Sequence, residues 1–247
     1  MATATPLLRI EKLVKRYGDR TVLRQIDLAV EAGQAVGLVG VNGAGKTTLL
    51  KCMLDFVSYD SGTITICGRS ATDTAARSAL AYLPERFVPP YYLSGHDFLS
   101  FMTGLYGVDL DRDRLLDLLP AVDLNAAALE LPVRQLSKGM AQKLGILSCL
   151  LSDRPLLIMD EPMSGLDPKA RACIKHHLAS LRNEGRTLFF STHLLYDVES
   201  QCDRVAILHE GVLAFHGTPE ECCRRFASNT LEQAYLRCVG SAPGGPI

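Results

Sequence analysis

The chain has 247 residues, of which 47% are hydrophobic and 21% charged, and these globular values exclude wholesale disorder. Its 26 basic and 27 acidic side chains give a formal net charge of -1. This balance argues against a general nucleic-acid binder, which usually carries a strong basic excess. A membrane span needs about 20 consecutive apolar residues, and the sequence has no such run. The length suits one α/β domain, with at most a small subdomain.

The chain ends and the cysteines carry little functional signal. Residues 1–6 lack a basic region followed by an apolar stretch, so we expect no secretion signal. The eight cysteines are scattered without zinc-type spacing, and we expect reduced thiols in a cytosolic protein. A metal-handling role for Cys222, Cys223 and Cys238 is a weaker alternative. Residues 241–247 are rich in glycine and proline and predict a mobile tail.

Hydrophobic periodicity predicts the elements of the amino-terminal part. Apolar and polar residues alternate over 7–17 and 21–30, which is typical of two antiparallel strands joined by a turn. Four more elements are expected before residue 90, namely a buried strand at 35–39, a helix at 47–56, and strands at 63–67 and 80–83.

A helical stretch then separates these strands from a second set. Helical periodicity begins near residue 95, and we expect residues 90–152 to form an inserted helical subdomain. Its last helix is predicted at 137–151, with Ser137 as the N-cap. The remaining elements are strands at 156–160, 187–192, 204–208 and 212–216, helices at 168–183 and 194–201, and a terminal helical piece.

This order of elements predicts the fold class. Strands that alternate with helices indicate an α/β fold with a mainly parallel sheet. The first two strands would form an antiparallel β subdomain beside it. The sequence contains no low-complexity linker and no internal repeat, so we expect residues 1–240 to form a single domain.

A phosphate-binding pattern follows the buried strand. Residues 40–47 read G-V-N-G-A-G-K-T and match G-x-x-x-x-G-K-[ST] in full. Glycines allow backbone N–H groups to converge on phosphate oxygens, and the helix N-terminus favours the same anion. Lys46 would place a charge on the β- and γ-phosphates, while the Thr47 hydroxyl could bind Mg²⁺. The pattern predicts a P-loop NTPase core, with nucleotide contacts from Gly40, Asn42, Gly43, Ala44, Gly45, Lys46, Thr47 and Thr48.

Two carboxylates end the apolar strand at 156–160. An acid at the carboxyl end of a parallel strand faces the ligand crevice of the sheet. Asp160 is therefore the candidate Mg²⁺ ligand. Glu161 is the candidate base that polarises a water for attack on the γ-phosphate. A pair of exposed strand-end acids is the structural alternative, and the phosphate loop favours the catalytic interpretation.

Further motifs occur in a fixed order along the chain. Together with the phosphate loop, they resemble the nucleotide-binding subunit of an ABC transporter over about residues 7–225. The matching segments are the adenine-stacking aromatic Tyr17, the Q-loop Tyr82–Glu85, the signature Leu136–Met140, the D-loop Ser164–Asp167 and the switch histidine in Ser191–His193.

The resemblance implies roles for these residues. In the family, two subunits pair head-to-tail around two ATP molecules. Ser137 and Gly139 would close over the ATP of the other subunit, and Asp167 would communicate across the dimer. His193 would reach the γ-phosphate, and Tyr17 would stack on adenine. As simpler alternatives, Ser137 and Asp167 could be ordinary N-caps, and Tyr17 could pack on the sheet.

Two positions depart from the common family pattern. Glu85 stands where the Q-loop usually has glutamine, and Lys138 replaces a signature glycine. Glu85 still offers oxygen to Mg²⁺ or water, but it adds negative charge near the phosphates. Both departures resemble an exporter branch in which ATPase subunits pair with separate membrane subunits.

A docking region for such a partner is expected at 86–93. This segment is apolar, aromatic and rich in proline. In the family, this region and the helical subdomain form the groove for a membrane subunit's coupling helix, a helix-in-groove arrangement. Changing Phe87 or Tyr91 should therefore impair assembly more than ATP binding. An internally packed loop is the alternative.

The sequence predicts an ATP-hydrolysing motor subunit of an ABC transporter, of the exporter type. Its expected cofactors are ATP and Mg²⁺. Its expected partners are a second copy of the ATPase and separate transmembrane subunits, at the cytoplasmic face of the membrane and without nucleic acid. A soluble, non-transport ABC ATPase is the alternative, although the paired domains or long coiled-coil insertions of those proteins are absent from the sequence. A small-molecule P-loop kinase would lack the signature and the switch histidine.

Overall fold

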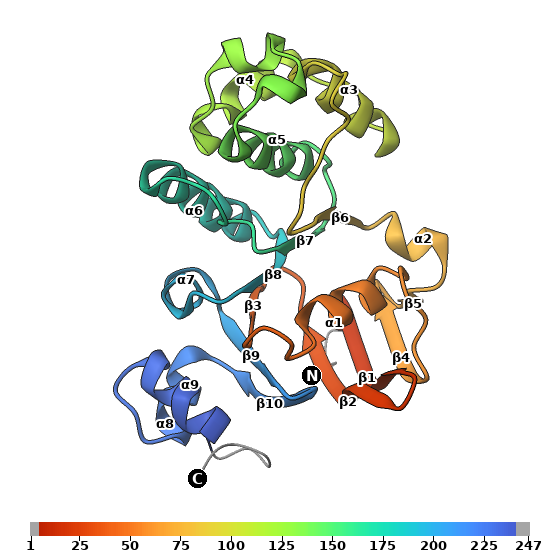
Figure 1. The fold of residues 1–247 in the computed structure, drawn as a ribbon, viewed down its shortest axis with the longest axis vertical. Coiled ribbons are helices and arrows are strands. Elements are labelled where there is room, and N and C mark those ends of the chain that lie inside the picture. Colours follow the sequence, from red (N-terminus) through yellow and green to blue (C-terminus); the bar gives the residue numbers. More distant parts are fainter. Residues whose placement is uncertain (1–4, 241–247) are drawn as a thin grey trace.

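The structure is a computed structural model that describes residues 5–240. The predicted tail at 241–247 lies outside the described residues. Two sheets form the framework (Figure 1). The smaller sheet is antiparallel, as predicted, in the order β2-β1-β4-β5. Its strands are β1 Leu8–Tyr17, β2 Arg20–Val30, β4 Ser61–Ile66 and β5 Arg69–Ser70.

The larger sheet has the order β10-β9-β3-β8-β7-β6. Its strands are parallel except for β10, which pairs antiparallel with β9. The predicted α/β class with a mainly parallel sheet is confirmed. The strands are β3 Ala35–Val39, β6 Leu80–Leu83, β7 Leu156–Asp160, β8 Thr187–Thr192, β9 Arg204–His209 and β10 Val212–Gly217.

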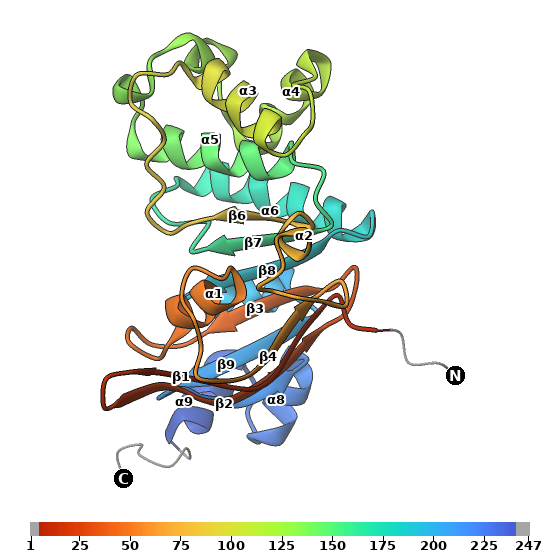
Figure 2. The same ribbon diagram turned by 90° about the vertical axis from the view of Figure 1, so that its right-hand side faces the viewer.

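The large sheet is buried on both faces, and each face has its own core. Side chains alternate along a strand, so Ala35 and Val39 of β3 join one apolar cluster while Val36 and Leu38 join the other. The first cluster lies under the long helices, and the second lies between the sheet and the antiparallel strands. Continuous apolar runs are therefore required of these strands, as in other parallel sheets. Figure 2 is seen from the side of α1 and the antiparallel strands, which lie in front of the large sheet, while α6 lies behind it.

The described residues form nine α-helices besides the two sheets. Helices α3 to α5 are inserted between β6 and β7, which are neighbours in the sheet, and they form the upper end of the molecule in Figure 1. The helices are α1 Lys46–Met53, α2 Thr74–Arg77, α3 Gly95–Leu105, α4 Arg112–Leu118, α5 Lys138–Leu150, α6 Pro168–Asn183, α7 Leu195–Gln201, α8 Pro219–Arg225 and α9 Leu231–Gly240.

Helix α1 ends three residues before its predicted end at 56. Asp55 adopts a left-handed φ of 58°, and the Phe56 N–H turns back to the Lys51 carbonyl at 2.9 Å. This bond is of the type that closes a helix C-terminus. The apolar periodicity of the sequence continues past this point, but the backbone turns away.

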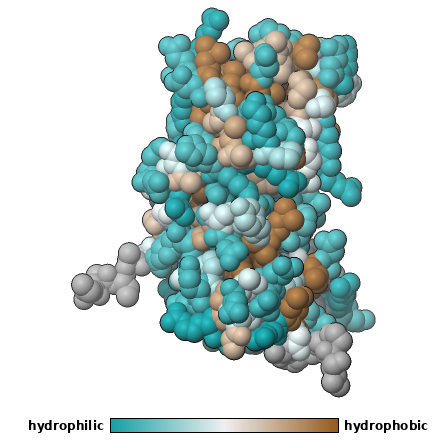
Figure 3. All heavy atoms as spheres, turned by 90° about the vertical axis from the view of Figure 1, so that its left-hand side faces the viewer, coloured by the Kyte–Doolittle hydropathy of each residue, from teal (hydrophilic) through white to brown (hydrophobic). Residues whose placement is uncertain are grey.

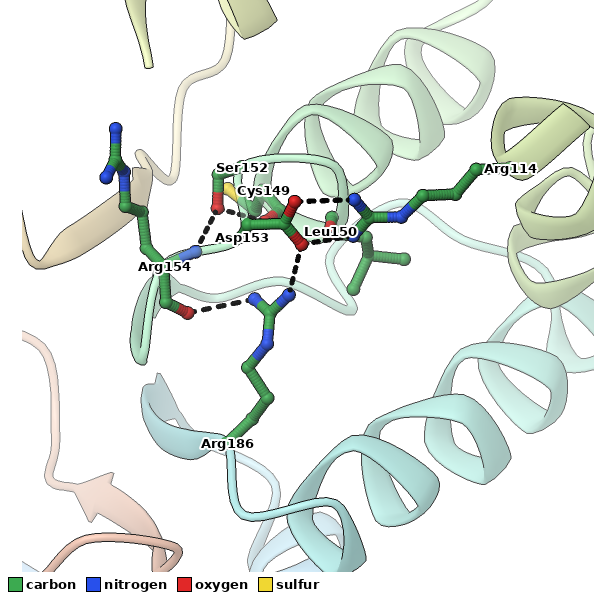
Figure 4. A network of polar contacts seen from close by, with 7 residues as sticks. All are labelled: Arg114, Cys149, Leu150, Ser152, Asp153, Arg154 and Arg186. Carbon is green, nitrogen blue, oxygen red and sulfur yellow. Dashed lines mark hydrogen bonds and ion pairs between the residues drawn. The ribbon is translucent and has the colours of Figure 1, made fainter. Parts of the chain in front are cut away.

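An ionic network joins the helical end to the sheet (Figure 4). Asp153, just after α5, accepts two hydrogen bonds from Arg114 of α4, at 2.7 and 2.6 Å. The same carboxylate accepts a bond from Arg186 at 3.1 Å, directly before β8. Arg186 also donates to the Arg154 carbonyl at 2.8 Å, and Arg154 donates to the Tyr106 carbonyl. The network therefore contacts α3, α4 and the large sheet together.

Apolar side chains also reach the surface of the helical end. They gather at the upper end of the face shown in Figure 3. The apolar stripe of α3 is split, since Phe98 is buried while Phe101 and Leu105 are exposed. Among residues 5–240, no helix combines the length and the apolar character that crossing a membrane requires.

Candidate active site

The phosphate loop follows β3 and leads into α1. A side chain at Gly40 would place its Cβ 2.4 Å from the Leu208 carbonyl oxygen, so only glycine fits. Gly43 and Gly45 have φ values of 84° and 112°, which also favour glycine. Lys46 is buried, and its ammonium donates to the Gly40 carbonyl at 2.7 Å. The loop therefore folds around the ammonium of Lys46, the first residue of α1.

The carboxyl ends of neighbouring parallel strands supply the acidic groups. Asp160 ends β7, is 2% exposed and accepts a hydrogen bond from the Ser191 hydroxyl on β8. The next residue, Glu161, has a left-handed φ of 50°. Its N–H donates to the carbonyl and hydroxyl oxygens of Ser191, at 3.2 and 3.1 Å. The Glu161 carboxylate lies 2.8 Å from Nδ1 of His193. Because β7 and β8 pair Asp160 with Ser191, four polar residues come together at this edge of the sheet, namely Asp160, Glu161, Ser191 and His193.

One cavity of about 450 Å³ lies over these groups. It brings together most of the predicted site residues from loops far apart in the sequence. Those lining it are Tyr17, Asn42, Gly43, Gly45, Lys46, Thr47, Thr48, Glu85, Asp160, Glu161 and His193.

Five further residues of the site had no individual role in the sequence-based prediction, although three of them stand within its motifs. Arg20, Val22, Val41 and Ser164 also line the cavity. Ser191 lies beneath it and contacts both Asp160 and Glu161. The sequence feature that could have indicated them is their position, because each lies within five residues of a predicted site residue. Only the fold shows that four of them line the same cavity and that Ser191 contacts two of its acidic residues.

The donor set fits a magnesium ion. Burial raises the pKa of Asp160, and the negative charges of Glu85 and Glu161 raise it further, against the Ser191 hydrogen bond and the Lys46 charge. Carboxylates crowded in this way gain from a divalent cation, and Mg²⁺ prefers hard oxygen ligands. Thr47, Asp160 and Glu85 would hold the ion. When bound, it would neutralise developing charge on the β- and γ-phosphates.

Five predicted residues do not line this cavity. Gly40 and Ala44 are buried within the phosphate loop itself. Ser137 accepts a bond from the Met140 N–H at 3.2 Å and caps α5, while Asp167 accepts one from the Ala170 N–H and caps α6. Both structural alternatives for these two residues are therefore present. Gly139 lies in the first turn of α5, beside Ser137.

The expected docking segment contains two kinds of aromatic residue. Phe87 packs inward against Phe98 of α3, with ring centroids 5.5 Å apart. Tyr91 and Tyr92 are exposed and contact each other edge to face. The docking role expected of both residues stays a prediction, but the two side chains differ in exposure, because Phe87 is half-buried and Tyr91 is exposed. Phe87 belongs to the internal packing of the helical end.

Comparisons with known proteins agree with this geometry. The family model described as "ABC transporter" matches residues 23–164, more than half of the chain. The chain belongs to the ABC transporter family.

Two similar proteins support the same family. An uncharacterised ABC transporter ATP-binding protein of Nostoc sp. is 39% identical over 202 residues, covering 81% of this chain. The chain spans only 60% of that relative's length. The Nod factor export ATP-binding protein I of Ralstonia nicotianae is 36% identical over 224 residues, covering 88% of this chain and 69% of the relative.

A solved structure shares the whole fold. The ATP-binding subunit of an ABC transporter superposes with a TM-score of 0.88 at 32% identity. The match covers 94% of this chain and 99% of that one. The similarity therefore includes the helical insertion as well as the sheet.

Proposed function

We propose that this chain is the ATP-binding and ATP-hydrolysing motor subunit of an ABC exporter. The observation that carries the proposal is the single cavity in which the phosphate loop, Asp160, Glu161 and His193 meet. The export function named for the Ralstonia relative supports the exporter assignment. The relatives are named as transporter subunits, which does not favour a soluble non-transport ATPase.

The residues divide the chemistry between them. Loop N–H groups and Lys46 would bind the phosphates, and Tyr17 would stack on adenine. Glu161 would hold the attacking water and accept its proton, while its contact with His193 fixes the carboxylate in place. The water oxygen bonds to the γ-phosphorus as the bond to the leaving ADP oxygen breaks. Because Glu161 and His193 are already in contact without a nucleotide, little reorganisation of these two groups would be needed.

Two partners follow from what lies outside the cavity. Ser137 and Gly139 begin a 13-residue helix whose N-terminus suits an anion, and they do not line the chain's own cavity. A second copy placed head-to-tail would bring them to its nucleotide, with Asp167 near the seam. Transmembrane subunits would dock on residues 86–93 and the helical subdomain. The single domain over 1–240 would then sit at the cytoplasmic face of the membrane.

Glu161→Gln tests the proposal. The amide cannot accept the water's proton, so Mg²⁺-ATP should trap a dimer with very low turnover. Sedimentation of the purified chain would show the dimer, and phosphate release would show the turnover. Lys46→Ala is the matched control, which should bind ATP weakly and stay monomeric. Normal hydrolysis by Glu161→Gln would overturn the base assignment.

A further inference from the structure

The first two turns of α5 are attached to the segment 162–167, which follows Glu161. The first attachment lies at the start of α5, in the signature segment Leu136–Met140, which we call the signature turn. The side chain of Lys138 lies over Gly165, with Cε 3.4 Å from the position of a Gly165 Cβ. A Cβ on Gly139 would lie 3.2 Å from the Gly165 carbonyl oxygen. The turn and the segment are therefore in direct contact.

Gln142 makes the second attachment, one turn further along α5. Its side chain is buried, and Nε2 donates to the Pro162 carbonyl at 3.1 Å. A buried amide N–H that loses its acceptor destabilises the folded protein, because it has no water to bond to instead. The bond therefore fixes the start of segment 162–167 against the helix.

Lys143 makes the third attachment and is 7% exposed. Its ammonium donates to the Asp123 carbonyl at 2.7 Å and lies 3.2 Å from the Asp123 carboxylate. It also lies 3.6 Å from Oδ2 of Asp167. The other Asp167 oxygen caps α6 through the Ala170 N–H. One buried cation thus joins α5, the turn at 123 and the N-terminus of α6.

The amino-terminal part of segment 162–167 is also close to the cavity. Glu161 and Ser164 both line it, and Pro162 lies between them in the chain. A shift of α5 would therefore be transmitted through Gln142 and Lys143 to both ends of the segment. Buried, hydrogen-bonded contacts of this kind move together because packed interiors deform little.

We propose that Gln142 and Lys143 are positioning residues that hold the signature turn in register with segment 162–167. Through them, closure of Ser137 and Gly139 over the nucleotide of a second copy is coupled to the geometry at Glu161. The inference rests on the proposed function, because it requires an ATP-dependent dimer. Neither side chain touches the nucleotide cavity of its own chain.

The test compares Lys143 with Lys169, which offers a matched control. Lys169 pairs with the same Asp123 at 2.6 Å, but it is 78% exposed and does not pair with Asp167. In a Glu161→Gln background with saturating Mg²⁺-ATP, Lys143→Met should raise the dimer dissociation constant about tenfold. Lys169→Met should leave it unchanged, and Lys143→Arg should restore it. Sedimentation measures the constant, and a fluorescent ATP analogue measures nucleotide binding by the monomer, which all variants should retain.

Two results would overturn the inference. Equal dimerisation of Lys143→Met and its parent would show that the attachment carries no coupling. Loss of monomer nucleotide binding together with a lower melting temperature would show a merely structural role. Gln142→Leu provides an independent variant, since it breaks only the Pro162 bond and should also weaken the dimer. If the Glu161→Gln parent itself fails to dimerise, the proposed function fails, and the coupling falls with it.

Discussion

Ser191 shows how one hydroxyl connects the two acids of the proposed catalytic site. It donates to Asp160 and accepts from the Glu161 N–H. Asp160 is a proposed Mg²⁺ ligand, and groups that orient a metal ligand typically contribute about 10- to 100-fold to activity. We expect Ser191→Ala to lower the rate of ATP hydrolysis about tenfold, with ATP affinity changed little.

Ser148→Ala is the control for this prediction. Ser148 is also a buried serine, and it bonds only to the Gly145 carbonyl within α5. Steady-state phosphate release at several Mg²⁺ concentrations would measure both variants. Equal rates for Ser191→Ala and Ser148→Ala would remove the proposed role of Ser191.

The residues that the sequence could predict have spacing that the chemistry itself demands. The glycines of the phosphate loop, Lys46 and the two acids at the end of β7 belong to this group. Ser191 could not be assigned in this way, because its role depends on the register in which it faces Asp160. Arg20 and Val22 likewise enter the cavity only because the antiparallel sheet lies beside the phosphate loop.

At the scale of elements, periodicity predicted most strands and helices because each has one apolar face or is wholly buried. Its failures have local causes. Helix α1 ends at Met53, just before the left-handed Asp55. The long helical stretch includes three 3₁₀ turns between α4 and α5. Neither turn type changes the hydrophobic pattern enough to be recognised. The sequence also did not predict which elements contact each other, as in the ionic network around Asp153.

Asp153→Asn tests the network that joins α3, α4 and the sheet. The hydrogen bond from Arg114 lowers the pKa of Asp153. Its stabilising effect is therefore complete above the ordinary Asp pKa of about 4 and is lost as the pH falls through the lowered value. Because these side chains are partly exposed, we expect a loss of about 1 kcal/mol at neutral pH.

Thermal unfolding followed from neutral to acid pH would measure this effect. The melting temperature of Asp153→Asn should fall by about 2–4 °C at neutral pH, and its difference from the parent should shrink in acid. Asp109→Asn, an exposed acid in the loop before α4, should change neither. A constant difference at every pH would show that the charge of Asp153 is unimportant.

At the scale of the whole molecule, the two halves of the proposed nucleotide site lie on different parts of one chain. The phosphate loop and its acids lie on the large sheet, whereas Ser137 and Gly139 belong to the helical insertion. The sequence placed both within one family pattern, but it could not show that Ser137 is absent from the chain's own cavity. That separation is what makes a second copy necessary in the proposed function.

The surface of the helical end leads to the last prediction. Tyr91 is 67% exposed and packs only against Tyr92 among the aromatic residues near it. Exposed aromatic side chains are frequent anchors of protein interfaces, where truncation of an anchor costs about 2 kcal/mol or more. Tyr91→Ala should therefore weaken binding to the membrane subunits about 30-fold or more, while the isolated chain binds ATP normally.

Pull-down of the membrane subunits from detergent-solubilised membranes would measure this binding. Tyr196→Ala is the matched control, because Tyr196 is equally exposed but lies on α7, in contact with Lys175. Phe87→Ala should behave differently from both, since Phe87 packs on Phe98 and its loss should lower the melting temperature. Undiminished pull-down by Tyr91→Ala would move the docking surface away from 86–93.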